Sequence, residues 1–213
     1  KGKLRGVGFI FVLCFLISSV LFLPLDVEYV IYGILLFAMM ISGYLDDASK
    51  TPWNEYKKGL IDLVISVVAV LTYMNFNSTT ICFGADEIVI PKALFLILGV
   101  ILIWVSVNVT NCTDGVDGLC ASLCSVTLLA FGVLFAPILQ KYAMANFLFL
   151  SVLFAYLYFN SSPSSMLMGD AGSRALGFYI AVIALKSTHP FIYLLLAAVM
   201  IVDGGIGLVK IAL

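Results

Sequence analysis

Long apolar runs separated by short polar segments dominate this chain. A membrane-spanning helix needs about 20 mainly apolar residues, within a range of roughly 17–25, and several of these runs meet that test. None of them alternates polar and apolar residues as a barrel strand does, and a helix satisfies its own backbone groups in lipid. The pattern predicts eight helical spans: Gly6–Leu23, Tyr29–Leu45, Leu60–Phe76, Ala93–Val109, Leu119–Leu139, Tyr142–Phe159, Gly172–Lys186 and Phe191–Val209.

Composition supports the same class of protein. Of the 213 residues, 63% are hydrophobic and 11% are charged, whereas a soluble domain carries roughly 25% charged residues. The sequence therefore predicts an all-α, polytopic transmembrane helix bundle, with residues 1–213 forming a single membrane domain. Gly172–Lys186 is the weakest of the predicted spans, and the long side chains of Arg174 and Lys186 near its ends are expected to extend to the membrane interface.

Basic residues are distributed unevenly between the connecting segments. With eight spans the connectors alternate sides, and one side collects eight Lys and Arg residues whereas the other collects three. The positive-inside rule assigns the first side to the cytoplasm. On the other side, the segment "TTICFGADEIVI" predicts a small external hairpin with a turn near residues 84–86.

The same alternation places three acidic segments on the cytoplasmic side. They are "GYLDDASK" (43–50), "NVTNCTDGVDGL" (108–119) and "NSSPSSMLMGDAGSRALG" (160–177). Because these segments are distant in sequence but share one membrane face, we expect their carboxylates to form one composite cytoplasmic site.

The first segment combines neighbouring carboxylates with basic residues. Asp46 and Asp47 repel each other unless a cation lies between them. Mg²⁺ suits such oxygen ligands, because it takes one or two carboxylates and completes its shell with water and substrate phosphate. Lys50 and Lys58 supply point charges suited to phosphate. Taken alone, this segment also fits a solvated interfacial loop.

The second segment is richer in polar groups than a helix cap requires. Asp114 and Asp117 are three residues apart and would share one side of a helix. Gly115 lets the backbone approach a ligand closely, and free N–H groups at the start of the next helix could hold a phosphate. Asn108 and Asn111 add donors and acceptors.

Further polar residues lie at the ends of, or within, later spans. Asp170 stands between small residues just before a helix and can point at a metal, and Asn160 could contact a base edge. Asp203 is a functional candidate, because an acid near the centre of a span costs roughly 2.5–3.5 kcal/mol, although it could instead lie near the cytoplasmic interface. Asp62 follows Lys58 by one turn, which predicts a local ion pair. Together these groups fit phosphoryl transfer between a nucleotide and a membrane-held acceptor.

Three motifs, in this order, resemble those of the polyprenyl-phosphate N-acetylhexosamine-1-phosphate transferases. "DDASK" is similar to that family's Asp-Asp-x-x-Lys, "NVTNCTDGVDGL" to its Asn-x-x-Asn-x-x-Asp-Gly-x-Asp-Gly-Leu, and "MGDAGS" to its Met-Gly-Asp-x-Gly-Ser. The resemblance covers nearly the whole chain. Details such as "CTDGVDGL" and "RGVGFIF" are most similar to the branch that moves phospho-MurNAc-pentapeptide from UDP-MurNAc-pentapeptide to undecaprenyl phosphate, giving lipid I and UMP with Mg²⁺.

The resemblance implies an enzyme of the bacterial cytoplasmic membrane with its active site on the cytoplasmic face. The family has ten spans, so the first and last would lie outside this chain. Asp170 would be the main Mg²⁺ ligand, and the base could be Asp46, Asp47 or Asp114. The catalytic group would comprise Asp46, Asp47, Asp114 and Lys50. Nucleotide and substrate would contact Asn108, Asn111, Gly115, Val116, Asp117, Asn160, Lys58 and Asp203. Leu167 replaces the aromatic residue that usually precedes the Met-Gly-Asp motif, which removes a surface for base stacking.

Two other functions remain open on the sequence. A sister branch of the family transfers GlcNAc-1-phosphate from UDP-GlcNAc to the same lipid and shares the motifs. A transporter could use the acids to bind coupling ions, but transporters place such sites near the midplane of repeated halves, and no internal repeat is visible here. The expected partners are the two substrates and membrane lipid, without nucleic acid, and a homodimer is left open.

Overall fold

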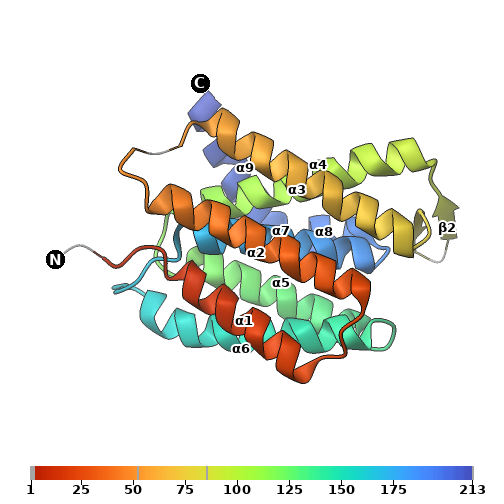
Figure 1. The fold of residues 1–213 in the computed structure, drawn as a ribbon, viewed down its shortest axis with the longest axis horizontal. Coiled ribbons are helices and arrows are strands. Elements are labelled where there is room, and N and C mark those ends of the chain that lie inside the picture. The colour runs from red at the N-terminus through yellow and green to blue at the C-terminus, as the bar shows by residue number, and fades with distance from the viewer. Residues whose placement is uncertain (1–2, 52, 85, 213) are drawn as a thin grey trace.

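The computed structural model describes residues 3–51, 53–84 and 86–212 (Figure 1). Within them the regular structure is helical, apart from one pair of short strands that follows the third helix. The elements are α1 (Gly8–Phe22), α2 (Val27–Asp47), α3 (Glu55–Phe76), β1 (Thr80–Phe83), β2 (Asp86–Val89), α4 (Lys92–Thr113), α5 (Leu119–Phe135), α6 (Gln140–Asn160), α7 (Gly169–Lys186), α8 (Pro190–Leu196) and α9 (Ala198–Ala212).

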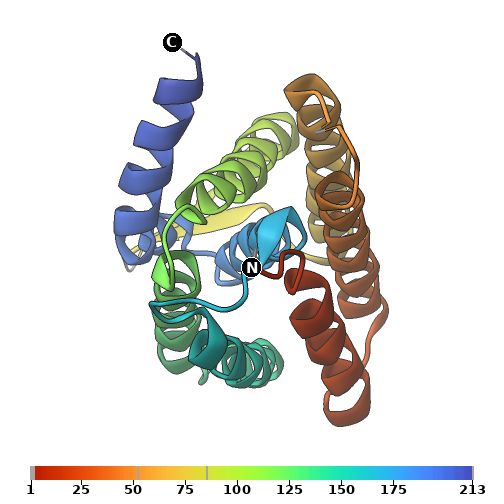
Figure 2. The same ribbon diagram turned by 90° about the vertical axis from the view of Figure 1, so that its left-hand side faces the viewer.

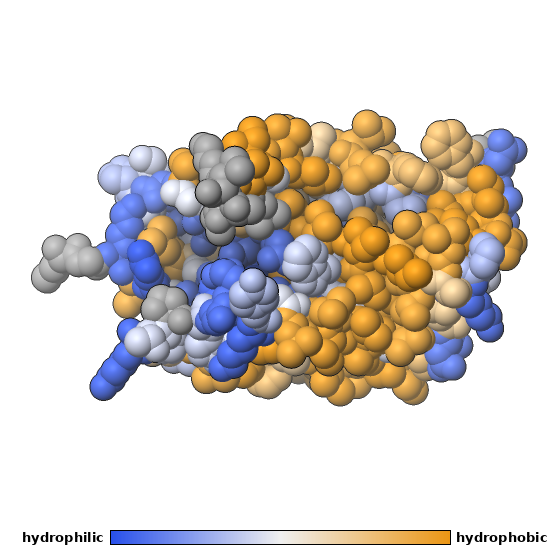
Figure 3. Space-filling model, turned by 90° about the horizontal axis from the view of Figure 1, so that it is seen from above, coloured by the Kyte–Doolittle hydropathy of each residue, from blue (hydrophilic) through white to orange (hydrophobic). Residues whose placement is uncertain are grey.

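The surface of the bundle is that of a membrane protein. Four of the described helices, α2, α3, α4 and α6, are long and apolar enough to cross a membrane, and the bent pair α8–α9 would make a fifth span. An apolar band covers the middle of the molecule and polar side chains gather at its two ends (Figure 3). The predicted polytopic bundle is therefore supported, whereas the predicted number of eight spans is not established.

The segment predicted as the span Phe191–Val209 is two helices. The axes of α8 and α9 meet at an angle of 74°, and the residue between them is Ala197. Neither Gly nor Pro marks this position, so the uniformly apolar pattern gave no signal of a break. The direction of α9 follows from packing, because Gly204 lies directly against the backbone of Val109 in α4.

Helix α7 lies at the centre of the bundle, surrounded by the other helices (Figure 2). Every side chain from Ala171 to Leu185 is buried. A helix that contacts protein on all sides needs small residues for close packing more than it needs a long apolar run. This explains why the weakest predicted span is the best buried helix. It also corrects the expectation that Arg174 and Lys186 extend to the interface, because their side chains are 2% and 8% exposed and paired with acids.

The predicted hairpin is present. Strands β1 and β2 pair antiparallel, with Thr80 opposite Val89 and Phe83 opposite Asp86. Gly84 has a φ of 65°, which a glycine adopts without steric cost. The hairpin lies at the end of the bundle opposite the N-terminus (Figure 1).

The three polar segments meet at one end of the bundle. The loops α2–α3, α4–α5 and α6–α7 all lie at the end where the N-terminus is found (Figure 1). The segment before α1 pairs with the segment before α7, since Leu167 N donates to Leu4 O at 2.8 Å and Gly8 N donates to Met168 O at 3.0 Å. This end therefore carries the candidate site.

Candidate active site

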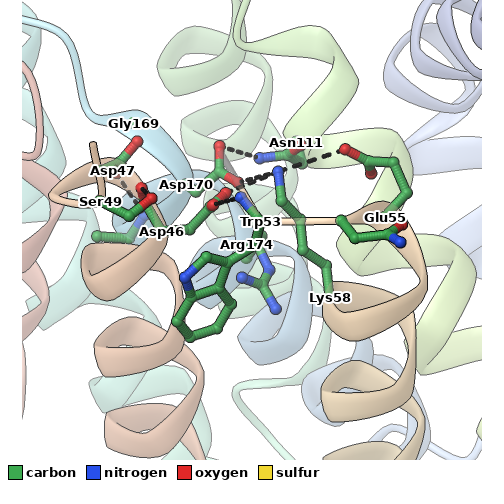
Figure 4. Close-up of polar contacts among 12 residues, drawn as sticks. Asp46, Asp47, Ser49, Trp53, Glu55, Lys58, Asn111, Gly169, Asp170 and Arg174 are labelled. Atoms are coloured by element: carbon green, nitrogen blue, oxygen red, sulfur yellow. Dashed lines mark hydrogen bonds and ion pairs between the residues drawn. The ribbon is translucent and has the colours of Figure 1, made fainter. Parts of the chain in front are cut away.

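Lys58 stands at the centre of a carboxylate cluster (Figure 4). Its Nζ lies 2.7 Å from Oδ2 of Asp46 and 3.3 Å from Oδ2 of Asp170. Asp46 is 7% exposed, and its second oxygen accepts a hydrogen bond from the backbone N–H of Trp53 at 2.6 Å. Two carboxylates from α2 and α7 thus share one cation from α3, which offsets their mutual repulsion.

Asn111 orients Asp170 from the other side. The Asn111 amide nitrogen donates to Oδ1 of Asp170 at 3.0 Å and to Oγ of Ser173 at 2.9 Å. Each oxygen of Asp170 therefore has a partner, Lys58 on one and Asn111 on the other. Because those partners come from α3 and α4, the position of Asp170 depends on three helices.

Asp47 lies over the start of α7. Its Oδ2 accepts a hydrogen bond from the backbone N–H of Ala171 at 3.2 Å, as a carboxylate does at the positive end of a helix. Gly169 has a φ of 68°, and a Cβ added there would lie 2.9 Å from the carboxyl carbon of Asp47. Only glycine allows this approach, which explains the residue type in the "MGDAGS" motif.

A polar cavity of about 200 Å³ opens beside these carboxylates. Its lining residues are Arg5, Asp47, Asn111, Asp114, Leu167, Gly169 and Asp170. Burial, together with the charges of Asp170 and Asp47, raises the pKa of Asp114 to about 7, although the backbone of Gly169 acts in the other direction. Asp114 can therefore exchange a proton near neutral pH.

The donors suit Mg²⁺ by chemistry more than by a preformed cage. Within residues 3–51, 53–84 and 86–212, no three acidic, His or Cys side chains converge closely enough to hold a metal alone. Mg²⁺ does not require such a cage, because it commonly takes one or two carboxylates and fills its shell with water and substrate phosphate. Asp47, Asp114 and Asp170 supply hard oxygen ligands around one cavity.

Comparison with protein families identifies the fold's relatives. The model of "Glycosyl transferase family 4" matches residues 29–188, which include all three acidic segments and more than half of the chain.

The chain belongs to glycosyl transferase family 4.

Curated relatives of this family 4 chain carry a common name. This chain is 36% identical to phospho-N-acetylmuramoyl-pentapeptide-transferase of Treponema pallidum subsp. pallidum, over 100% of this chain and 64% of the relative. Proteins of the same name from Wolinella succinogenes and Microcystis aeruginosa are 30% and 31% identical, over 92% and 85% of this chain and 63% and 53% of theirs. The family 4 chain thus spans less than two thirds of the length of these relatives. The family resemblance predicted from the motifs is confirmed.

A second group of predicted residues lies in the α4–α5 loop and at the end of α6, outside the lining of the cavity. Both oxygens of Asp117 contact Lys3 Nζ, at 2.8 and 2.9 Å, and Oδ2 also accepts from Ser164 N at 3.1 Å. Lys3 and Ser164 lower the pKa of Asp117 to about 2. Asn160 is 2% exposed, and its amide bonds Gly118 N and Met166 O. In the family 4 chain, Asn160 therefore joins the second acidic segment to the third, and nucleotide contact by this group stays a prediction.

Several predicted site residues are not drawn into the cluster. Lys50 and Asp203 are exposed and form no ion pair with described residues. Asn108 donates to Trp104 O in its own helix, and Val116 is 64% exposed. Gly115 faces open space, with nothing within 4 Å of a Cβ built on it. The structure brings together Asp46, Asp47, Lys58, Asn111, Asp114 and Asp170.

The predicted local pair between Lys58 and Asp62 is wrong. Asp62 instead pairs with Arg174, and both side chains are buried. The spacing along α3 permits the local pair, but Arg174 from the central helix takes Asp62, and Lys58 turns to the carboxylates of α2 and α7.

Arg5 is a site residue that the sequence interpretation missed. In the sequence Arg5 contributes only to the excess of cytoplasmic charge, although it begins the "RGVGFIF" stretch that carries part of the resemblance. Backbone pairing of Leu4 and Val7 with the segment 165–167 carries Arg5 to the cavity. No pattern in the sequence predicts this pairing of two loop segments.

Proposed function

We propose that this chain, within a protein of its relatives' length, transfers phospho-MurNAc-pentapeptide from UDP-MurNAc-pentapeptide to undecaprenyl phosphate, giving lipid I and UMP. The observation that carries the proposal is a cavity lined by three carboxylates and one guanidinium at the polar end of an apolar bundle. The name of its curated relatives supplies the transferred group, phospho-N-acetylmuramoyl-pentapeptide. The UDP donor and the undecaprenyl phosphate acceptor come from the motif resemblance.

The site would act mainly by position and charge, as is usual in phosphoryl transfer. In this proposal Asp170 and Asp47 would hold Mg²⁺, which when bound would neutralise charge on the transferring phosphate. Asp46 is occupied by Lys58 and the amide of Trp53. Its role in this scheme is to hold Lys58 beside Asp170.

The chain's own cations and Asp114 complete the chemistry. Arg5 and Lys58 would bind phosphate oxygens of the donor, since guanidinium and ammonium groups suit phosphate. Asp114, with a pKa of about 7, would take the proton from an acidic oxygen of the acceptor phosphate. That oxygen then bonds to the sugar-linked phosphorus, the bond from this phosphorus to the bridging oxygen breaks, and UMP leaves with the bonding electrons.

The apolar band would serve the acceptor. A polyprenyl phosphate can keep its tail in hydrocarbon while its phosphate reaches the polar end of the bundle. We propose that this end faces the cytoplasm of a bacterial cytoplasmic membrane, because the Lys and Arg residues predicted for that side outnumber those of the other side even when the buried Arg174 is left out.

The test is UMP release by the full-length protein in detergent with Mg²⁺ and undecaprenyl phosphate. We expect release with UDP-MurNAc-pentapeptide, no release with UDP-GlcNAc, and none when the lipid acceptor is omitted. Asp170→Ala is the inactive control and should abolish metal-dependent turnover. Release only with UDP-GlcNAc would move the protein to the sister branch, and release with neither donor would refute the proposal.

A further inference from the structure

Two charged pairs are stacked between α3 and α7. On α3, Lys58 is followed four residues later by Asp62, and on α7, Asp170 is followed four residues later by Arg174. Lys58 Nζ lies 3.3 Å from Asp170 Oδ2, and one helical turn further from the polar end Arg174 Nη2 pairs with Asp62 Oδ1. Both pairs therefore run across from one helix to the other.

The same four residues could pair within their own helices. Residues four apart in a helix are neighbours, so Lys58 is within reach of Asp62, and Asp170 is within reach of Arg174. Along-helix pairing would withdraw Lys58 from Asp46 and Asp170, and would set Arg174 against Asp170. The crossed arrangement is thus one of two ways to satisfy the same charges, and only this one keeps Lys58 in the candidate site.

The deeper pair is poorly suited to a purely stabilising role. The side chains of Arg174 and Asp62 are 2% and 3% exposed, and within the part of the chain that the structure describes, Nε and Nη1 of Arg174 have no hydrogen-bond partner. A buried ion pair repays its desolvation only when its remaining polar groups are satisfied, so it is weak evidence for stability. A role in selecting one arrangement fits these contacts better.

We infer that Arg174 is a positioning residue of the candidate site: by holding Asp62, it keeps Lys58 bound across to Asp46 and Asp170. If Arg174 is lost, Asp62 is left as a buried unpaired carboxylate, and Lys58 is the cation one turn away that can compensate it. Lys58 then leaves Asp46 and Asp170 without their shared cation. This inference rests on the proposed function for its kinetic readout.

The experiment is a set of variants of the full-length protein, assayed by UMP release per folded molecule. Arg174→Leu should lower kcat by about 10–100-fold, because a misplacement of about 1 Å at a site costs about that much. Adding Asp62→Asn should restore kcat to within about threefold, because no buried charge then competes for Lys58. Arg174→Leu should cause no further loss of kcat in a Lys58→Met background.

A matched control separates positioning from general destabilisation. Lys186 and Glu28 form a buried pair at the opposite end of the bundle, with Nζ 2.9 Å from Oε2 and side chains 8% and 10% exposed. Lys186→Met should reduce stability while leaving kcat of the folded protein unchanged. If Arg174→Leu does not fold, Asp62→Asn tests the same inference, because Arg174 would then turn to Asp170 and kcat should fall.

Full kcat in Arg174→Leu would overturn the inference, and so would a loss of kcat that Asp62→Asn does not restore. An additive loss in the Lys58→Met background would also contradict it. If the wild-type protein releases no UMP with either donor, the proposed function fails by itself. The inference is then decided by an experimental structure of Arg174→Leu, in which Lys58 should contact Asp62 and no longer Asp46.

Discussion

The approach of α2 to α7 leaves no room for a methyl group at Gly43. A Cβ built there would lie 2.6 Å from the backbone nitrogen of Ala171 and closer still to the carbonyl group of Asp170. The obstacle is backbone, which cannot rotate away as a side chain could. Gly43→Ala must therefore displace the start of α7 from α2, and with it the carboxylate that we assign to the metal.

The size of the effect follows from the contact distances. Ordinary contacts of a Cβ with heavy atoms begin near 3.4 Å, so the still closer contacts with the carbonyl group of Asp170 require the two helices to separate by about 1 Å. Overpacking of this kind costs about 1–3 kcal/mol of stability. A displacement of about 1 Å at reacting groups costs about 100-fold in rate. We therefore expect kcat to fall by about 100-fold while the protein still folds.

The assay is UMP release together with thermal unfolding, and the control lies in the same helix. A Cβ at Gly33 would meet only the side chain of Leu16, at 3.9 Å. Gly33→Ala should therefore keep full activity and gain up to about 1 kcal/mol, because alanine favours a helix over glycine. Activity within twofold of wild type in Gly43→Ala would refute the assignment of Asp170 to a rigidly held site.

Three further predictions concern two residues of the cavity, Asp114 and Arg5, and the predicted nucleotide-binding residue Asp117. The raised pKa of Asp114 is about 7, and a base must be deprotonated, so kcat should fall about tenfold per pH unit below that value and level off above it. Asp114→Asn should be slow and should lose this decline of kcat at low pH. An unchanged decline in Asp114→Asn would exclude Asp114 as the base. Arg5→Ala should raise KM for the UDP-sugar by about tenfold or more, and Arg5→Lys should recover part of it; an unchanged KM in Arg5→Ala would remove Arg5 from the donor site. Asp117→Ala should impair nucleotide use and raise KM, and near-full activity at low donor concentration would show that Asp117 serves only to hold Lys3.

The sequence predicted which segments meet, because that conclusion needs only the motifs and the alternation of connecting segments between the two membrane sides. Apolar runs fixed the approximate helices, and alternation of sides brought Asp46, Asp114 and Asp170 to one end. The hairpin around Gly84 and the family resemblance followed from local patterns and are confirmed. Each of these predictions depends on residues that are close in sequence or on a simple alternation.

Choices between equivalent partners could not be predicted in this way. Asp62 has Lys58 one turn away on its own helix and Arg174 across on α7, and the sequence gives no reason to prefer the distant partner. The break between α8 and α9 at Ala197 could not be predicted for a related reason. The sequence around it is apolar on both sides, and the bend follows from packing of α9 on α4. Such features depend on the assembled bundle.

The central position of α7 connects these failures to the site. Hydropathy ranks the segment Gly172–Lys186 last because it carries Arg174 and Lys186. These charges, and Asp170 at the start of α7, are tolerated in the bundle since α2 and α3 supply partners for each of them. The helices can supply those partners only at short range. Glycines allow the helices to approach this closely. Gly43 leaves room for the backbone of Asp170, and Gly8 of α1 lies against Gly172. Close packing and charge pairing are therefore one requirement, and a methyl group at Gly43 should disturb the ion pairs as surely as removal of Lys58.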